Sequence, residues 1–407
     1  MRRMEHAIGS RVADLMRLAS ILLLSALTAL AVVSCGGSDD TPGTPNPPVP
    51  SQPKADTPIA FSGNLSDDKS ESHARTRATD LEESHTTFYA WAYKNPSSGP
   101  TETVMHNYTV NYVSNSAGST TTNSHDWEYV NQQASGGAEQ SVKYWDFSAA
   151  AYRFFGYAGS GVTKKYYQDA TQLSEEALMV TTPTKVTLSF TASVSSNPQT
   201  DPVTLPLTST TPLYSKLWYK TPSAQIASQP VKLEFLQPYV KVRFLFKQAA
   251  PEDVVFELTE KHFKPTNNEK TIATAGTFTV TYPMKGATTE ESWSVTGVTA
   301  SLSGGLTQDY YEAGDDETDQ DILDAQKKWY VVLPAHADDQ GSYTLYVKVN
   351  GEEKEVVVPA QYMEWRPGYE YTYIFKILDE GGVALDNVMV GFSAWIVENK
   401  DREIYNW

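Results

Sequence analysis

The sequence predicts an all-β protein, and three observations lead to that class. Apolar and aromatic residues alternate with polar ones in short segments, which is the period of a strand with one buried face. Turn-forming residues separate these segments at short intervals. Only residues 174–179 and 319–328 carry a weak helical pattern. Many short strands with frequent turns are typical of β-sandwiches and barrels.

The first element of the chain is an export signal. Four arginines precede an apolar run over residues 18–33, which is too short and too early in the chain for a convincing membrane span. A basic region followed by a short apolar region is the pattern of a secretory signal peptide, predicted here over residues 1–34. We find no later run that approaches the roughly 20 apolar residues of a second span.

The signal ends at Ser34-Cys35-Gly36, which contains the only cysteine of the chain. Small residues around a cysteine resemble the lipobox of bacterial lipoproteins, where cleavage between Ser34 and Cys35 leaves the cysteine as a lipid-bearing N-terminus. Lipidation of Cys35 is therefore predicted. The alternative is an ordinary cleaved signal with an incidental cysteine. Each buried methylene of a lipid chain contributes about 0.8 kcal/mol to membrane binding, and stable anchoring takes at least two acyl chains.

A tether and an acidic body follow the cysteine. Residues 35–57 are rich in Pro, Gly and Ser and have few apolar side chains, so we expect a disordered tether. The net charge of −17 becomes more negative once the leader, with four arginines against two acidic residues, is removed. An acidic body repels nucleic acid, so no nucleic-acid partner is expected.

The body divides into strands, and its firmest local prediction is a hairpin. Residues 343–349 alternate and lead through Asn350-Gly351 into the apolar residues 356–358. Asn-Gly supplies the two positive-φ positions of a type I′ turn. Six prolines lie between residues 198 and 230, and we place a boundary there between two domains, 58–225 and 226–407. Other alternating segments are 88–93, 231–235, 240–246 and, after a turn at 366–368, 369–377.

Sequence motifs for chemistry are absent. The histidines are scattered, with no pair at metal-ligand spacing, and no Gly-x-Ser-x-Gly elbow, Walker loop or dinucleotide fingerprint is present. Residues 315–324 are acidic but lack the spacing of an EF-hand, which favours a solvated loop over a calcium site. We therefore predict no catalytic residues, no metal, no cofactor and no enzymatic activity.

Aromatic residues are abundant and permit a second kind of site. The chain has nine Trp, 24 Tyr and 14 Phe, and exposed aromatic rings can stack on sugars. The same residues are also favoured on strands and in sandwich cores. Trp145 and Trp365 are the two candidate glycan contacts, with a core position as the alternative for each.

The order of these features resembles the fimbrillin family of type V pilins and related surface lipoproteins of Gram-negative anaerobes. Each motif alone is weak, and their order along most of the chain carries the resemblance. One departure is Gln237, which stands where the family often has a histidine. The matching segments are the cysteine motif at 34–36, then 58–63, 74–78, 88–93, 144–145 with 152–157, 231–235 with 240–246, 329–334, and 367–368 with 371–373.

The resemblance implies two tandem transthyretin-like β-sandwich domains in a fimbrial subunit that serves cell adhesion at the outer membrane. In the family, an Arg-specific protease removes the N-terminal segment with its first strand, and a strand of another subunit takes its place. Here the cut would follow Arg75 or Arg77, within a possible propeptide strand region at 58–77. Loss of such a strand would expose a groove that another strand can fill by β-augmentation.

The best candidate for the donated strand is the C-terminal segment, where apolar residues alternate on one face. The same pattern also describes the last strand of the chain's own sheet, and both interpretations stay open. The expected partners are other fimbrial subunits, the outer membrane through Cys35, and a ligand on a host or bacterial surface. The alternative function is a monomeric glycan-binding lipoprotein of a polysaccharide uptake system. The candidate donor residues are Val388, Val390, Phe392, Ala394 and Ile396.

Overall fold

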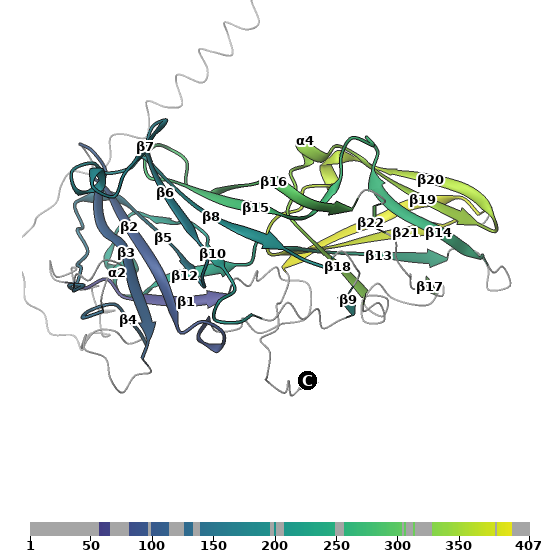
Figure 1. The fold of residues 1–407 in the computed structure, drawn as a ribbon. Helices are drawn as coiled ribbons and strands as arrows, with labels where there is room; N and C mark the ends of the chain where they lie inside the picture. Colours follow the sequence, from purple (N-terminus) through teal and green to yellow (C-terminus); the bar gives the residue numbers. More distant parts are fainter. Residues whose placement is uncertain are drawn as a thin grey trace, which may run out of the picture. The chain divides into compact units, whose positions relative to one another are not determined.

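The predicted all-β class is confirmed by the computed structural model, in which strands make up most of the described chain (Figure 1). None of the helices in the described part is long and apolar enough to cross a membrane. The predicted leader and all of the predicted tether except Thr57 lie outside the described residues. These are 57–65, 81–96, 99–113, 126–132, 139–195, 199–200, 207–248, 256–302, 305–306, 312–313, 328–378 and 381–392.

The largest sheet has eight strands in the order β10-β12-β1-β4-β3-β2-β5-β11. Because β10 also pairs with β5, seven of these strands close into a ring. The strands are β1 (Phe61–Leu65), β2 (Thr87–Pro96), β3 (Glu102–Tyr112), β4 (Trp127–Glu128), β5 (Ala149–Ala158), β10 (Leu213–Ser215), β11 (Trp218–Lys220) and β12 (Val231–Leu236).

A five-stranded sheet, β16-β15-β8-β6-β7, joins residues from both sides of the boundary predicted at residue 225. Strands β15 and β8 pair along their lengths, with Phe278 opposite Phe190. A domain boundary near residue 225, in α2 (Ala224–Ala227), would therefore place paired strands in different domains. The two-domain division stays a prediction. The strands are β6 (Thr163–Gln168), β7 (Thr171–Leu173), β8 (Lys185–Ser193), β15 (Ile272–Pro283) and β16 (Ser292–Leu302).

Two further sheets contain the remaining strands. One has the order β22-β21-β13-β18-β9 with β17 beside β13, and the other has the order β14-β19-β20. The strands are β9 (Gln199–Thr200), β13 (Val240–Gln248), β14 (Leu258–Pro265), β17 (Glu312–Ala313), β18 (Lys328–Val332), β19 (Tyr343–Val349), β20 (Glu352–Val358), β21 (Tyr369–Ile377) and β22 (Val383–Phe392).

Local turn chemistry agrees with the predicted hairpin. Strands β19 and β20 are antiparallel, and Asn350 and Gly351 form the two-residue loop with φ values of 51° and 83°. Of the two weak helical candidates, residues 174–179 contain only the 3-10 turn η2 (Ala177–Met179), and 319–327 lie outside the described residues.

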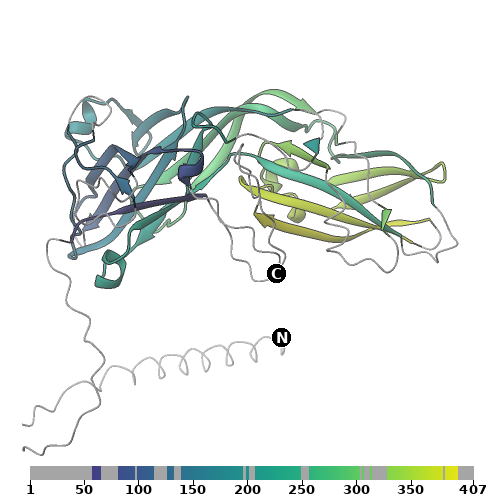
Figure 2. The ribbon, with the colours of Figure 1, turned by 90° about the horizontal axis from the view of Figure 1, so that it is seen from below.

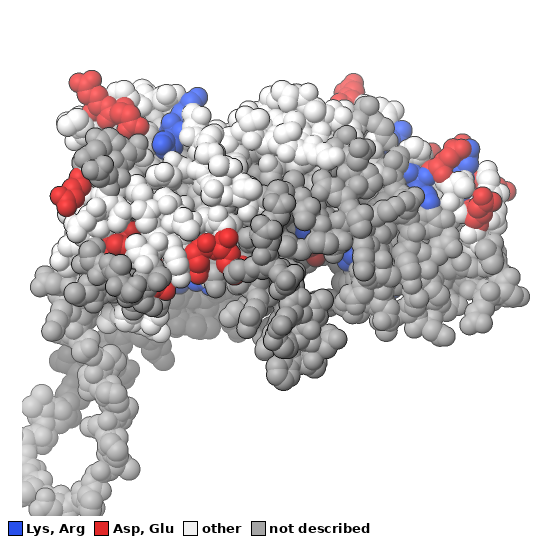
Figure 3. Space-filling model, turned by 60° about the horizontal axis from the view of Figure 1, so that its bottom comes forward, with Lys and Arg blue, Asp and Glu red and all other residues white. Residues whose placement is uncertain are grey.

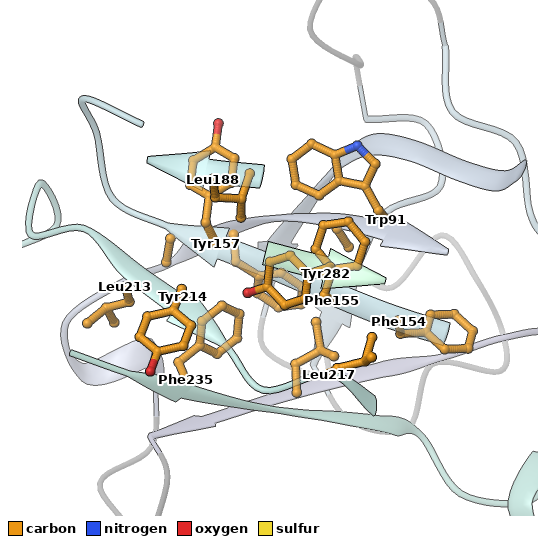
Figure 4. Packing of buried hydrophobic residues seen from close by; sticks show 14 of the residues in the cluster. Trp91, Phe154, Phe155, Tyr157, Leu188, Leu213, Tyr214, Leu217, Phe235 and Tyr282 are labelled. Carbon is orange, nitrogen blue, oxygen red and sulfur yellow. The ribbon is translucent and has the colours of Figure 1, made fainter. Parts of the chain in front are cut away.

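The buried apolar residues form two clusters. The first is dominated by aromatic rings: Phe155 stacks on Tyr282 with ring centroids 4.0 Å apart, and on Trp91 at 5.3 Å (Figure 4). The second cluster is formed mainly by residues of β13, β14, β18, β19, β20 and β21. Strand β18 serves both, because Trp329 and Val331 belong to the first cluster while their neighbours belong to the second. Alternation along one strand therefore links the two cores.

The side chain of His336 connects β16 to the short helix α4 (Ala337–Gln340). The imidazole of His336 stacks on the indole of Trp293 with centroids 3.8 Å apart. Its Nδ1 lies 3.0 Å from Glu364 Oε1, and its Nε2 lies 3.1 Å from the Trp293 carbonyl oxygen. Only the protonated ring can donate to both acceptors. Partial burial opposes the charge, but the Trp293 carbonyl, Glu364 and Asp339 outweigh it and raise the pKa of His336 above 6.5.

We expect this contact to be strongest at acid pH. A folded-state pKa above the unfolded value gives stability that is complete below about pH 6.5 and is lost as pH rises through the folded pKa. Because the side chain is 40% exposed, screening limits the effect to about 0.2–1 kcal/mol. Urea denaturation of the native chain and of His336→Gln tests this. The difference in unfolding free energy between the native chain and His336→Gln should decrease as pH rises from about pH 5.5 to about pH 8. A difference that stays constant over this range would exclude the effect.

Candidate functional site

The candidate site is strand β1 together with the groove that holds it. Strand β1 is one of the seven strands of the ring and lies between β12 and β4 (Figures 1 and 2). It runs parallel to β12, with Phe61 opposite Val231 and Leu65 opposite Phe235, and it meets β4 at Trp127. A short N-terminal segment thus fills a central position in a sheet whose other members come from residues 87–236.

Residues just before β1 are held on both sides. The Ile59 N–H donates to the Lys143 carbonyl at 2.8 Å, and the Val231 N–H donates to the Ala60 carbonyl at 2.8 Å. The Tyr129 hydroxyl donates to the Ile59 carbonyl at 2.9 Å. Burial raises the pKa of Tyr129, so the hydroxyl keeps its proton and remains a donor. Removing residues 59–65 would take these partners from the Lys143 carbonyl and the Val231 N–H, at about 1–3 kcal/mol for each group that stays buried and unpaired. The Tyr129 hydroxyl would keep the Lys143 carbonyl oxygen, 3.4 Å away, as an acceptor.

Phe61 is the central apolar anchor of β1. Its side chain is fully buried, and three rings meet it edge to face: Phe88 at 5.9 Å, Tyr129 at 5.8 Å and Phe154 at 5.9 Å between centroids. Such pairs contribute about 0.5–1.5 kcal/mol beyond the area they bury. Ile59, two residues earlier, is also buried, and Leu65 packs partly against the same cluster. The groove therefore has a regular series of inward positions at every second residue.

The third inward position is narrow. A Cβ atom added to Gly63 would lie 2.7 Å from Leu81 Cδ2 and 3.4 Å from Phe88 Cε1. Leu81 begins the 3-10 turn η1 (Leu81–Glu83) and is fully buried. No local sequence pattern points to Leu81 or Tyr129 as groove residues, because other segments separate both from β1 along the chain.

Four predicted site residues in the N-terminal part of the chain lie outside the described residues. They are Ser34 and Cys35 of the lipidation motif and Arg75 and Arg77 of the predicted cleavage site. Strand β1 ends at Leu65 and the next described residue is Leu81, so both arginines belong to the connection that follows β1. These four assignments stay predictions.

The C-terminal candidate lies in its own sheet as far as it is described. Strand β22 pairs antiparallel with β21, with Val388 opposite Tyr373 and Val390 opposite Tyr371. Val388 packs against the second core, whereas Val390 is 54% exposed. Ala394 and Ile396 lie outside the described residues, and Phe392 is described only through its backbone pairing with Tyr369.

The two candidate glycan contacts require a correction. Trp145 is 3% exposed and packs against Tyr152, Phe154 and Trp218, while Trp365 is 1% exposed and its Nε1–H donates to the Tyr373 hydroxyl at 2.9 Å. An indole this deeply buried offers no face to a sugar ring. Both residues belong to the cores, and the glycan-binding alternative loses the residues that suggested it.

Among the described residues, no group of three or more His, Cys, Asp or Glu side chains is placed to hold a metal ion. On the face shown in Figure 3, the visible Lys and Arg groups are small, and those on the right lie beside Asp and Glu groups. Gln237, the departure from the resemblance, is buried, and its amide atoms have no hydrogen-bond partner in the described chain.

Comparison with known proteins gives structural neighbours only. No family model and no curated protein matches the chain. Similar solved structures include a "putative cell adhesion protein" from Bacteroides uniformis, at 15% identity, covering 83% of this chain and 98% of that chain with a TM-score of 0.31. A protein of the same description from Parabacteroides distasonis has 9% identity, 86% and 100% coverage, and a TM-score of 0.34.

A third neighbour is a fimbrial assembly protein from Parabacteroides distasonis. It has 11% identity, covers 80% of this chain and 98% of its own, and has a TM-score of 0.31. All three neighbours are proteins of Bacteroidales, and their names refer to cell adhesion or fimbrial assembly.

Proposed function

We propose that this chain is a subunit of a cell-surface fimbria, either of the shaft or an accessory component, and that it serves adhesion to a host or bacterial surface. It would be exported to the outer membrane as a precursor lipidated on Cys35. Cleavage after Arg75 or Arg77 would then release β1 and allow a strand of another subunit to enter. The names of the structural neighbours agree with this class, although the proposal does not rest on them.

The observation that carries the proposal is the position of β1. It is an interior strand of the largest sheet, yet it is the first described strand and is followed directly by the segment that contains both arginines. The polar sequence of this segment predicts an exposed loop, where proteolysis concentrates, and a cut there would leave β1 held only by noncovalent contacts. Strand exchange requires this combination of a central strand and a cut next to it.

The energies make exchange reasonable. Ile59 and Phe61 are almost fully buried, and each such side chain contributes about 1.5–3 kcal/mol. The unpaired edge of β12 adds to the cost of an empty groove. Together these terms approach a large part of a domain's stability of about 5–15 kcal/mol. The cleaved chain would therefore gain folding stability by binding any strand that restores the same contacts, as in β-augmentation.

Replacing both arginines tests the processing step. In the native organism, the variant Arg75→Ala/Arg77→Ala should keep its N-terminal segment, so that the surface protein is longer and forms no polymer. Immunoblots of surface fractions under non-dissociating conditions report both size and polymer. Lys69→Ala, a basic residue of the same segment, is the matched control and should be processed normally. Unchanged size and unchanged polymer in the double variant would refute the processing step.

A further inference from the structure

Strand β16 forms one end of the five-stranded sheet and pairs with β15 alone in the described chain (Figure 1). It is 11 residues long and reads Ser-Trp-Ser-Val-Thr-Gly-Val-Thr-Ala-Ser-Leu, without a charged residue or a proline. Ser292, Ser294 and every residue from Thr296 to Ser301 are exposed. The outer edge of such a strand presents backbone N–H and C=O groups that can pair with another strand.

The other sheet ends of the described chain are protected against such pairing. Strands β7, β9, β11 and β17 have only two or three residues each. Strand β20 carries four charged residues, β14 carries three and ends at Pro265, and β22 contains Asp386. Short length, charge and proline are the usual means of keeping sheet edges apart. Among the described sheet ends, β16 alone is both long and uncharged.

The open part of this edge begins after Trp293. The Trp293 carbonyl oxygen lies 3.1 Å from Nε2 of His336, whose imidazole also stacks on the indole. That contact occupies the Trp293 carbonyl and covers the first residues of β16. Residues 294–302 continue beyond it, and most of them are exposed.

A bulge lies in the middle of the open part. Thr296 pairs with Thr277 and Ala300 pairs with Ala275, so residues 297–299 stand opposite a single residue of β15. Gly297 has a φ of 55° there, and Val298 is 48% exposed. A bulge bends its strand and redirects side chains. The edge therefore presents one apolar side chain with Ser, Thr and Ala residues on both sides of it.

A second copy of the chain is the partner that this edge fits by charge. The chain has a net charge of −17, so two copies repel each other and can meet closely only where the contact itself is uncharged. A basic partner would find no carboxylate along β16. In antiparallel pairing, hydroxyl-bearing residues of the two strands face one another, which is a favourable cross-strand arrangement. It also keeps the exposed Glu290 of each copy at opposite ends of the contact.

We propose that β16 is a self-association edge, along which two copies of this chain pair antiparallel about a two-fold axis near Val298. Each copy would use the same strand, as in any isologous contact. The pairing requires neither cleavage nor an empty β1 groove. Only its consequence for a fimbria rests on the proposed function: repeated along two polymers, a weak contact of this kind would hold them side by side through multivalency.

Charged substitutions at Val298 test the pairing. The chain from residue 36 to 407 contains every described residue, and sedimentation velocity over a concentration series measures its dimerisation. Val298→Lys and Val298→Glu should each weaken dimerisation about tenfold or more, because like charges would meet across the axis. An equimolar mixture of the two variants should restore it. Val357→Lys, at a 57% exposed position of the charged edge strand β20, is the matched control and should change the dissociation constant less than about threefold.

Cysteine cross-linking locates the contact. The same chain has no cysteine, because Cys35 is the only one in the sequence. Under mild oxidation Val298→Cys should form a disulfide-linked dimer, since a disulfide needs Cα atoms within about 7 Å and residues near a two-fold axis meet their own copies. Val357→Cys should stay monomeric. Equal cross-linking of the two variants would overturn the proposed axis.

The other outcomes are also decisive. A native chain that stays monomeric at every concentration would overturn the second copy as the partner. Dimerisation that withstands both Val298 variants, or that mixing them does not restore, would overturn β16 as the edge. None of these results bears on strand exchange, because the size and polymer state of the Arg75→Ala/Arg77→Ala variant report that step separately.

Discussion

The variant Phe61→Ala is expected to lose about 3–5 kcal/mol of folding free energy, the usual cost of emptying a phenylalanine site in a packed core. Phe61 is fully buried and its ring meets Phe88, Tyr129 and Phe154 edge to face, so the loss combines transfer, cavity and ring-contact terms. Urea denaturation measures the total. Hydrogen exchange of the β12 amides, Val231 to Phe235, should show that protection falls where β1 was paired.

Ser62→Ala is the control for this variant. Ser62 is the next residue of β1, lies on the opposite face and is only partly buried, so its replacement should cost less than about 0.5 kcal/mol. If Phe61→Ala and Ser62→Ala cost the same, the aromatic site would not be the anchor of β1, and the case for a specific groove would fail.

The variant Gly156→Ala is expected to destabilise the first core strongly. The added Cβ would lie 2.5 Å from the backbone carbonyl oxygen of Tyr89, an atom fixed by the pairing of β2 with β5. The Gly156 N–H also donates to Ser215 Oγ at 2.8 Å, so β5 cannot move away freely. We expect a loss of more than about 3 kcal/mol, seen as a lower denaturation midpoint and poor soluble yield.

Gly382→Ala provides a matched comparison. An added Cβ there would meet only Leu378, at 3.5 Å or more, which is ordinary van der Waals contact. This change should be neutral or slightly stabilising, because alanine reduces the conformational freedom of the unfolded chain. Comparable losses at both glycines would mean that close approach of β5 to the Tyr89 carbonyl does not limit the fold.

Local patterns predicted the parts of the fold that depend on neighbouring residues. The hairpin around Asn350-Gly351 follows from the positive φ of its two loop residues, and β21 follows from Tyr371, Tyr373 and Phe375 on one buried face. Alternation identifies one buried face of a strand, but it could not show whether the opposite face is buried as well. The sequence therefore left Trp145 and Trp365 open between a glycan contact and a core position, and both are buried.

Long-range pairing accounts for what the sequence did not predict. Strand β15 pairs with β8 across the proposed domain boundary. Strand β1 pairs with β12, although most residues of the first core lie between these two strands in the sequence. Neither pairing leaves a local signal. The resemblance supplied the idea that the first strand is removable, whereas the narrow contact between Gly63 and Leu81 emerges only from the packing.

The N-terminus of polymerised protein from the cell surface tests the central claim most directly. Mass spectrometry of fimbrial material, purified without denaturant and then dissociated, identifies the first residue of each subunit. The strand-exchange account predicts a start at Thr76 or Ala78, immediately after one of the two arginines, with Ile59 and Phe61 absent from the polymer. A polymer whose subunits begin at a lipidated Cys35 and retain β1 would contradict the account.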